Sequence, residues 1–372
     1  MAKEKYRIVA VIGTRPEVIK MAPVISELRK HDIFDITILN TAQHRSLLDD
    51  MLSIFNITPD IDLNVMQENQ SLATLSGNLF LKMEDIFSKH QFDVVLAQGD
   101  TTTTLISAQI AFYHHIPFGH IEAGLRSYNF RQPYPEEMNR VFVSQLSQWN
   151  YAPTVIEKDN LLKEGIPEEK IFVTGNTVID SLYLLSHKNT PLPFPLDKNK
   201  RLILVTLHRR ESFGEPIKHI LLALKQLAET FTDIEIIYPV HPNPNVHLQA
   251  EKILGHQPRI RLCPPLGYDQ FVSLMNRAYF IMSDSGGIQE EAPALNKPIL
   301  VLRNVTERPL IIDLGLGILV GDHTEKIFTT AAELLSNPTL YQRMQKNLSP
   351  YGDGHAAKYI VDSLVNHVSK DI

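Results

Sequence analysis

The chain has 372 residues, and at roughly 150 residues per domain this length predicts two domains or three. Its 36 basic and 42 acidic side chains give a net charge of −6, which argues against a dedicated nucleic-acid binder. A single cysteine, Cys263, excludes an internal disulfide and any site built from several cysteines. The sequence has no apolar stretch of about 18 residues and no secretory leader, so we expect a cytoplasmic protein without membrane contact.

Short apolar runs of strand length alternate with amphipathic stretches along the whole chain. After the first run, for example, Val18, Ile19, Ala22 and Ile25 recur at helical spacing. This alternation predicts parallel sheets covered by helices, and so many strands predict two doubly wound α/β domains rather than one sheet. The expected strands are residues 6–12, 35–39, 93–97, 118–121, 171–174, 202–206, 234–240, 260–263, 279–282, 298–302 and 318–320.

The boundary between the two domains has weaker signals than the strands. Residues 189–200 contain three prolines and predict a loop, which is either a hinge or an insertion. Gly175 and Asn176, which follow an expected strand, are an alternative start for the second half. Residues 356–368 have a helical pattern and could pack on either domain.

Polar residues follow the expected strands at their carboxyl ends, where open parallel sheets bind ligands. Arg15 lies beside Pro16 at the start of a helix, a position that favours anions, and Lys20 follows on the same helix. The spacing matches neither the nicotinamide fingerprint nor the P-loop. An ordinary charged surface helix is the alternative interpretation.

Three carboxylates in the first half are candidates for proton transfer. Asp100 follows the third strand, where it could instead cap a helix. Glu122 follows an apolar run and should be poorly solvated, with an ion pair to Arg126 as the alternative. Glu136 opens a helix, where the helix dipole favours an acidic residue in any case.

The second half also ends its strands in polar residues. Residues 285–287, Ser-Gly-Gly before a helix, suit a diphosphate because backbone N–H groups can approach it closely, although a plain tight turn is the alternative. Glu291 could accept two ribose hydroxyls, and His208 and Arg308 add positive charge. The histidines lack the spacing of a metal site, so we expect no metal. Together these residues predict a site for a nucleotide-linked anion in a cleft between two domains.

These motifs, in the order in which they follow one another along the chain, resemble those of the non-hydrolysing UDP-N-acetylglucosamine 2-epimerases. The matching segments are residues 13–23, 43–45, 99–104, 120–126, 135–137, 208–211, 284–293, 306–309 and 351–354. The resemblance implies two Rossmann-like doubly wound domains with a central cleft, the glycosyltransferase B-type architecture. It implies an N-terminal domain of residues 1–170, a UDP-binding domain of residues 171–355, and a C-terminal helix at 356–372 that packs back on the first domain.

The resemblance also implies the reaction. UDP-GlcNAc and UDP-ManNAc would interconvert by elimination of UDP to 2-acetamidoglucal and re-addition, without NAD or a metal, and the product would feed surface polysaccharide synthesis. The implied acid/base residues are Asp100, Glu122 and Glu136, with His208 assisting the departure of UDP. The implied substrate and UDP contacts are Arg15, Lys20, Phe271, Ser285, Gly286, Gly287, Glu291 and Arg308.

A homodimer and a second, activating UDP-GlcNAc site are further implications of the resemblance. The residues that match the second site are Gln43, His44, Gln70, Glu136, Arg210 and His241. The chain departs from the family pattern at Ser46, Asn69, Leu207, Leu266, Asn304 and Leu310. Three alternatives stay open: a hydrolysing epimerase that releases ManNAc and UDP, a glycosyltransferase of the same architecture, and a catalytically silent nucleotide-sugar binding protein.

Overall fold

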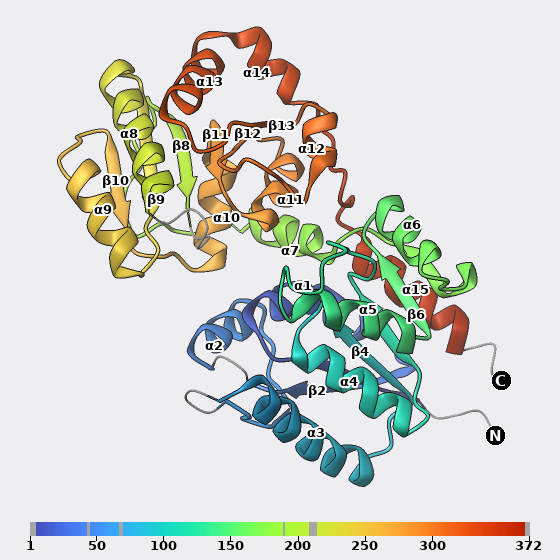
Figure 1. The fold of residues 1–372 in the computed structure, drawn as a ribbon. Coiled ribbons are helices and arrows are strands. Elements are labelled where there is room, and N and C mark those ends of the chain that lie inside the picture. Colours follow the sequence, from blue (N-terminus) through green and yellow to red (C-terminus); the bar gives the residue numbers. More distant parts are fainter. Residues whose placement is uncertain (1–4, 43–44, 67–69, 189, 208–213, 369–372) are drawn as a thin grey trace. The chain divides into compact units, whose positions relative to one another are not determined.

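The computed structural model describes residues 5–42, 45–66, 70–188, 190–207 and 214–368, with the backbone alone for residues 45–47. The chain divides into two compact units. The first unit comprises Met1–Ser181 and Tyr351–Ile372, and the second comprises Leu182–Pro350 (Figure 1). Among the described residues, no helix combines the length and the apolar character that crossing a membrane requires.

The first unit is built on a parallel sheet of seven strands in the order β3-β2-β1-β4-β5-β6-β7. Its strands are β1 (Tyr6–Ile12), β2 (Phe34–Asn40), β3 (Ile61–Asp62), β4 (Val94–Gln98), β5 (Phe118–Ile121), β6 (Trp149–Ala152) and β7 (Ile171–Val173). Its helices are α1 (Arg15–Leu28), α2 (Arg45–Ile54), α3 (Leu72–Lys89), α4 (Thr102–Tyr113), α5 (Glu136–Leu146), α6 (Val155–Lys163) and α15 (Ala356–Val368), with a short 3₁₀ helix at Glu168–Lys170. A further helix, α7 (Thr177–Ser186), leads from the first unit into the second.

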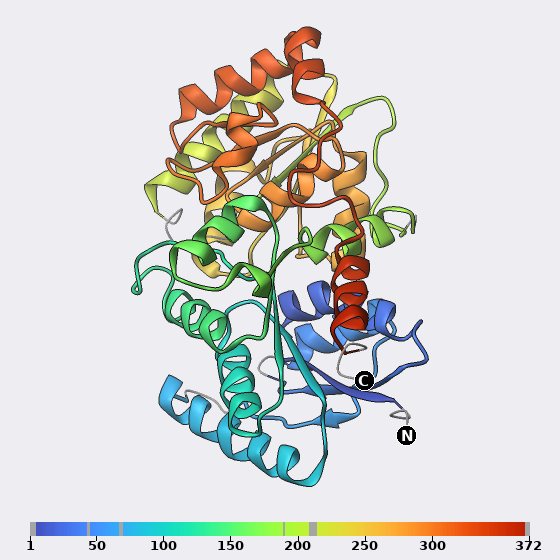
Figure 2. The ribbon, with the colours of Figure 1, turned by 90° about the vertical axis from the view of Figure 1, so that its right-hand side faces the viewer.

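Helices cover both faces of this sheet, which explains the uninterrupted apolar run of β1. Val9 and Val11 belong to one core cluster with Leu79 and Met83 of α3, while the alternate residue Ile8 is also fully buried. Helices α3, α4 and α5 pack side by side (Figure 1), and α15 packs against α1 (Figure 2). The C-terminal helix is thus part of the first unit.

The second unit contains a parallel sheet of six strands in the order β10-β9-β8-β11-β12-β13. Its strands are β8 (Arg201–Thr206), β9 (Ile234–Pro239), β10 (Ile260–Cys263), β11 (Phe280–Ser283), β12 (Ile299–Val301) and β13 (Gly317–Leu319). Its helices are α8 (Glu215–Thr230), α9 (Pro244–Leu254), α10 (Tyr268–Arg277), α11 (Gly286–Ala294), α12 (Pro309–Asp313), α13 (Thr324–Ser336) and α14 (Pro338–Met344). The order of these strands is that of the Rossmann fold, as expected from the sequence.

Two strands and one boundary differ from the expectation. The two-residue β3 is too short to give a pattern, and β6 mixes Trp, Asn, Tyr and Ala although all four side chains are buried. Strand β7, which the resemblance assigned to a second domain starting at residue 171, pairs in parallel with β6 and therefore extends the first sheet. The compact units accordingly divide after Ser181. Residues 190–200 form a loop, as predicted.

Candidate functional site

Each sheet has a switch point between two neighbouring parallel strands. From one of them the chain crosses to one side of the sheet, and from the other it crosses to the opposite side. In the first unit it lies between β1 and β4, and in the second between β8 and β11. Ligands of open α/β sheets bind beside the carboxyl ends of such strands. After β1, Arg15 is the first residue of α1, and Asp100 lies in the loop that follows β4. After β11, Ser285 precedes α11, and Gly286 and Gly287 are the first two residues of that helix.

A buried glutamate, Glu17, connects the two loops of the first switch point. Its carboxylate accepts hydrogen bonds from the backbone N–H groups of Gly13 and Thr14, both at 2.7 Å, and from the Thr101 hydroxyl at 2.5 Å. Burial raises the pKa of Glu17, and the hydrogen bonds oppose that rise. Glu17 is not among the site residues predicted from the sequence, although Thr14-x-x-Glu17 has the spacing of a capping box. Glu17 thereby fixes the start of the helix that carries Arg15.

Glu122 follows β5 directly, and three donors from the described part of the chain hold its carboxylate. It is 8 % exposed, and its φ of 65° lies in the left-handed region, which costs a residue with a side chain about 1–3 kcal/mol. Lys20 Nζ lies 2.6 Å from both carboxylate oxygens, and Asn176 Nδ2 donates to Oε1 at 2.8 Å. Gln98 Nε2 also donates, to Oε2. This buried carboxylate therefore has one defined orientation.

The alternative prediction for Glu122, an ion pair with Arg126, is wrong. The guanidinium of Arg126 is paired with Glu164, with Nε and Nη2 each 2.7 Å from a carboxylate oxygen, and it also donates to Ser144. This geometry is bidentate, which is the arrangement that arginine favours with a carboxylate. Glu122 pairs instead with Lys20, a residue 102 positions away in the sequence.

Asp100 lies beside the N-terminus of α4 but does not cap it. The capping residue is Thr101, whose hydroxyl accepts from the Thr104 N–H at 3.2 Å. Arg140 donates to Asp100 Oδ2 from both Nε and Nη2, and Asn139 Nδ2 donates to the Asp100 carbonyl oxygen at 2.8 Å. The loop after β4 is thus tied to α5.

The two glutamates at the start of α5 differ in their surroundings. Glu136 is half-buried as the first residue of the helix, whereas Glu137 is 1 % exposed. The Glu137 carboxylate accepts from the backbone N–H groups of Ser127 and Tyr128 at 2.9 and 2.8 Å and pairs with Arg140 at 3.2 Å. Glu137 therefore orders the loop before α5 and leaves Glu136 as the candidate for chemistry.

His120 is fully buried on β5, two residues before Glu122. Its Nε2 lies 2.7 Å from the carbonyl oxygen of Gly99, so we assign the ring proton to Nε2 because a carbonyl can only accept. Burial lowers the pKa of His120 to about 4, which makes the ring neutral at pH 7. Within the described parts of the chain, no three His, Cys, Asp or Glu side chains are grouped as metal ligands.

The predicted diphosphate cradle lies at the start of α11 in the second unit. Ser283 and Thr206 share a hydrogen bond between their hydroxyls at 2.7 Å, and Ser283 Oγ accepts from the Ser285 N–H at 3.0 Å. A Cβ placed on Gly287 would have the Ser285 hydroxyl, at 3.9 Å, as its nearest neighbour, so the backbone can be approached closely there. The first-turn amides of α11 suit an anion.

The side chains of α11 connect to the segments around it. Tyr268 of α10 donates to Glu291, and Thr306 donates to Gln289. Arg308 pairs with the buried Glu290. The predicted ribose acceptor and the predicted diphosphate cation therefore both belong to one connected set of residues in the second unit.

The remaining predicted residues are spread over both units. Arg15 and Phe271 are half-buried, on α1 and α10. Gln70 Nε2 donates to Met66 Sδ at 3.2 Å, and His241 Nδ1 accepts from the Asn243 N–H at 3.1 Å. The predicted residues Gln43, His44, His208 and Arg210 lie outside the described residues.

Comparisons with known proteins agree with these motifs. A family model described as UDP-N-acetylglucosamine 2-epimerase matches residues 26–365. The chain belongs to this epimerase family. A UDP-N-acetylglucosamine 2-epimerase of Neisseria meningitidis is 46 % identical, covering 97 % of this chain and 100 % of that protein. One of Bacillus subtilis is 44 % identical, covering 98 % and 96 %. Membership makes the protein an isomerase.

Solved structures extend the comparison to the fold. The crystal structure of UDP-GlcNAc 2-epimerase from Neisseria meningitidis bound to UDP-GlcNAc has a TM-score of 0.89, covering 97 % of this chain and 100 % of that chain at 46 % identity. A glycosyltransferase from Rickettsia africae has a TM-score of 0.57 at 15 % identity, covering 97 % and 94 %. The expected fold class, two Rossmann-like domains of the glycosyltransferase B type, is confirmed.

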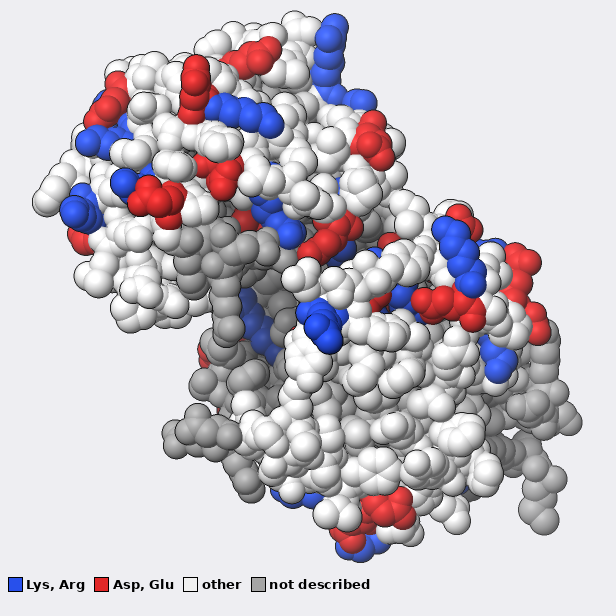
Figure 3. Space-filling view, in the orientation of Figure 1, with Lys and Arg blue, Asp and Glu red and all other residues white. Residues whose placement is uncertain are grey.

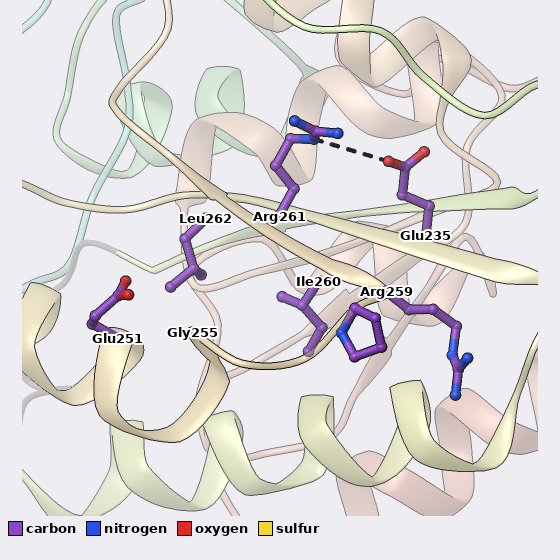
Figure 4. A pocket seen from close by; sticks show the side chains of 8 residues that line it. Glu235, Glu251, Gly255, Arg259, Ile260, Arg261 and Leu262 are labelled. Carbon is purple, nitrogen blue, oxygen red and sulfur yellow. Dashed lines mark ion pairs between the residues drawn. The ribbon is translucent and has the colours of Figure 1, made fainter.

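A polar pocket of about 320 Å³ lies elsewhere on this epimerase-family chain (Figure 4). It is lined by Glu251 from α9 and by Glu235, Arg259 and Arg261 around β10, with Arg261 Nε 4.0 Å from Glu235. Strand β10 is the edge of the second sheet, two strands away from β8. The pocket is therefore separate from the switch point and from the candidate site.

Proposed function

We propose that the protein is a non-hydrolysing epimerase that interconverts UDP-GlcNAc and UDP-ManNAc. The observation that carries the proposal is the Glu122 carboxylate, held in one orientation by Lys20, Gln98 and Asn176 at the carboxyl end of the first sheet. Membership of the epimerase family and the relative bound to UDP-GlcNAc support the choice of substrate.

The proposed reaction has two halves that reverse each other. A base removes the proton from C2 of the sugar, the electron pair of that bond forms the C1–C2 double bond, and the C1–O bond breaks with its electrons moving to UDP. The products are 2-acetamidoglucal and UDP. In the second half UDP oxygen adds to C1 and a proton is delivered to the opposite face of C2. The elimination and the re-addition involve no net oxidation or reduction of the sugar, so the proposed reaction needs neither NAD nor a metal.

Three carboxylates of the first unit are proposed to move these protons, namely Asp100, Glu122 and Glu136. Support for Glu122 comes from its burial and its three donors, and support for Asp100 comes from the paired Arg140, which restricts its orientation. General acid–base groups typically contribute about 10²–10⁴-fold to a rate. His208 is proposed to assist the departure of UDP.

The second unit is proposed to bind UDP. The start of α11 would take the diphosphate through backbone N–H groups, with Arg308 supplying charge. Glu291, held by the Tyr268 hydroxyl, would accept the ribose hydroxyls. Arg15 and Lys20 are proposed as further contacts to the substrate, and Phe271 as a neighbour of the uracil.

The test is proton NMR of the protein with UDP-GlcNAc in D₂O, without acceptor, NAD or added metal. We expect deuterium at C2 and the appearance of UDP-ManNAc. Free ManNAc and UDP as the main products would identify a hydrolysing enzyme instead. A requirement for an added acceptor would identify a glycosyltransferase.

Assembly and regulation are part of the proposal as well. A homodimer is supported by an exposed face of α3, α4 and α5 that is poor in charge (Figure 3), where Leu81, Phe112 and Tyr113 are 72, 60 and 61 % exposed. Activation by a second UDP-GlcNAc predicts stimulation of the reverse reaction by added UDP-GlcNAc; a hyperbolic response without stimulation would contradict it. A cytoplasmic location and a role in surface polysaccharide synthesis complete the proposal.

A further inference from the structure

Asn176, which takes no part in the bond changes of the proposed reaction, has its side chain hydrogen-bonded at both ends. Its Nδ2 donates to Glu122 Oε1 at 2.8 Å, and its Oδ1 accepts from the Val178 N–H at 3.1 Å. The side chain is 2 % exposed. Because Oδ1 faces a backbone N–H group, which can only donate, the amide cannot flip without losing both bonds. The donor is therefore always presented to the Glu122 carboxylate.

The backbone at Asn176 is fixed equally firmly. Its N–H donates to the Tyr351 carbonyl oxygen at 2.6 Å. Gly175 has a φ of 88°, and a Cβ there would lie 3.0 Å from the Cα of Gly352. The segment that leaves the first unit toward α7 and the segment that returns to it at Tyr351 are therefore packed against each other beside Asn176.

We propose that Asn176 is a positioning residue that orients the Glu122 carboxylate for proton transfer at C2 of the sugar. The inference rests on the proposed function. In this proposal Asn176 acts on the reaction through Glu122. Its amide supplies a neutral donor to Oε1, while Lys20 supplies the charged donor to both oxygens. Removing the neutral donor leaves the charge balance of the site unchanged and frees the carboxylate to turn.

Among the described residues, charged, titratable and neutral groups lie beside Glu122. Lys20 from α1 is paired with it, and His120 on β5 is neutral at pH 7 because burial holds its pKa near 4. Gln98 from β4 and Asn176 are uncharged donors. A carboxylate introduced at position 176 would therefore face Glu122 directly, and two carboxylates that share a site raise the pKa of one of them.

Two substitutions of Asn176 distinguish a role in orienting the Glu122 carboxylate from a role in the folding of α7. Asn176→Ser and Asn176→Asp both keep a side-chain oxygen suited to capping α7, but neither keeps the amide donor. The matched control is Ser181→Ala, which removes a buried hydrogen bond from α7 to the Ile19 carbonyl oxygen without touching Glu122. The measurement is the rate of deuterium incorporation at C2 of UDP-GlcNAc in D₂O as a function of pH, with thermal unfolding recorded for each variant.

We expect Asn176→Ser to slow C2 exchange at saturating substrate by about 10- to 100-fold, the cost of a misplaced group, with KM changed less than about threefold. We expect Asn176→Asp to move the acid limb of the exchange profile upward by about one pH unit or more. Ser181→Ala should lower the unfolding temperature without either effect.

Other outcomes overturn the inference. Exchange rates and pH profiles for both Asn176 variants that match the wild type would exclude a positioning role. An equal slowing by Ser181→Ala would mean that Asn176 serves only the folding of α7. Failure of the proposed function is a separate result, because it would appear as the absence of C2 exchange in the wild-type protein under all conditions.

Discussion

Replacing Glu122 by Gln should abolish most of the turnover and leave the fold intact. Among the residues that the structure describes, Lys20, Gln98 and Asn176 donate to the Glu122 carboxylate. A glutamine offers one oxygen and one NH₂ group, so at least one of these donors loses its acceptor. An unsatisfied buried donor costs about 1–3 kcal/mol. Loss of a general acid–base group costs about 10²–10⁴-fold in rate.

These two magnitudes separate a catalytic role from a structural one. A 100-fold loss of activity by unfolding alone would require about 99 % of the protein to be unfolded. A domain typically has about 5–15 kcal/mol of stability, so a loss of 1–3 kcal/mol leaves nearly all molecules folded. A rate loss of 100-fold or more, with an unfolding transition still well above the assay temperature, therefore identifies a chemical role for Glu122.

The assay is C2 deuterium exchange of UDP-GlcNAc in D₂O, alongside thermal unfolding. Glu164→Gln is the matched control, because it breaks the ion pair with the fully buried Arg126 guanidinium at 2.7 Å, and Glu164 has no assigned part in the reaction. The control should lose stability and keep its exchange rate. An exchange rate for Glu122→Gln within about threefold of the wild type would refute the role of Glu122 in proton transfer.

Three further predictions test other parts of the molecule. Burial lowers the pKa of His120 to about 4, so the stability that the neutral buried ring contributes is complete above pH 6.5 and is lost as the pH falls toward 4. In His120→Gln, urea unfolding should show roughly 3 kcal/mol less change in the free energy of unfolding over this pH range. In Gly13→Ala the new Cβ would lie 2.1 Å from a threonine hydroxyl oxygen, which should lower the free energy of unfolding by about 1–3 kcal/mol. Gly77 lies in α3 with open space at its Cβ position, so Gly77→Ala should raise the free energy of unfolding by about 0.5–1 kcal/mol in the same assay. Tyr268→Phe removes the donor to Glu291 and should raise KM for the UDP-sugar about tenfold with little change in kcat; an unchanged KM would argue against Glu291 as a ribose contact.

Much of the fold could be predicted because parallel strands buried on both faces give continuous apolar runs. The run at Tyr6–Ile12 matches β1, and its buried pattern extends over both faces of the strand. Strand β6 was missed because it is only four residues long and Asn150 interrupts its apolar run, although all four side chains are buried in the sheet. The predicted domain boundary at residue 170 differs from the structure because only the pairing of β7 with β6 shows that β7 belongs to the first sheet.

The candidate site could be predicted in part for a similar reason. Parallel strands end at one edge of a sheet, so the polar residues after β1, β4 and β5 had to lie near one another. Their partners could not be predicted, because they come from distant positions: Lys20 meets Glu122 across 102 residues, and Asn176 meets it across 54. Such pairings depend on tertiary contacts, and no local pattern of spacing records them.

The central claim is that the bond between the sugar and UDP breaks reversibly during epimerisation. UDP-GlcNAc labelled with ¹⁸O in the oxygen that joins C1 to the β-phosphorus tests it directly by phosphorus NMR. If UDP is eliminated and added back, its β-phosphate can turn between the two steps, so over many turnovers the label moves from the bridging position into the non-bridging positions of the β-phosphate. Label that stays in the bridge through many turnovers while UDP-ManNAc accumulates would contradict elimination.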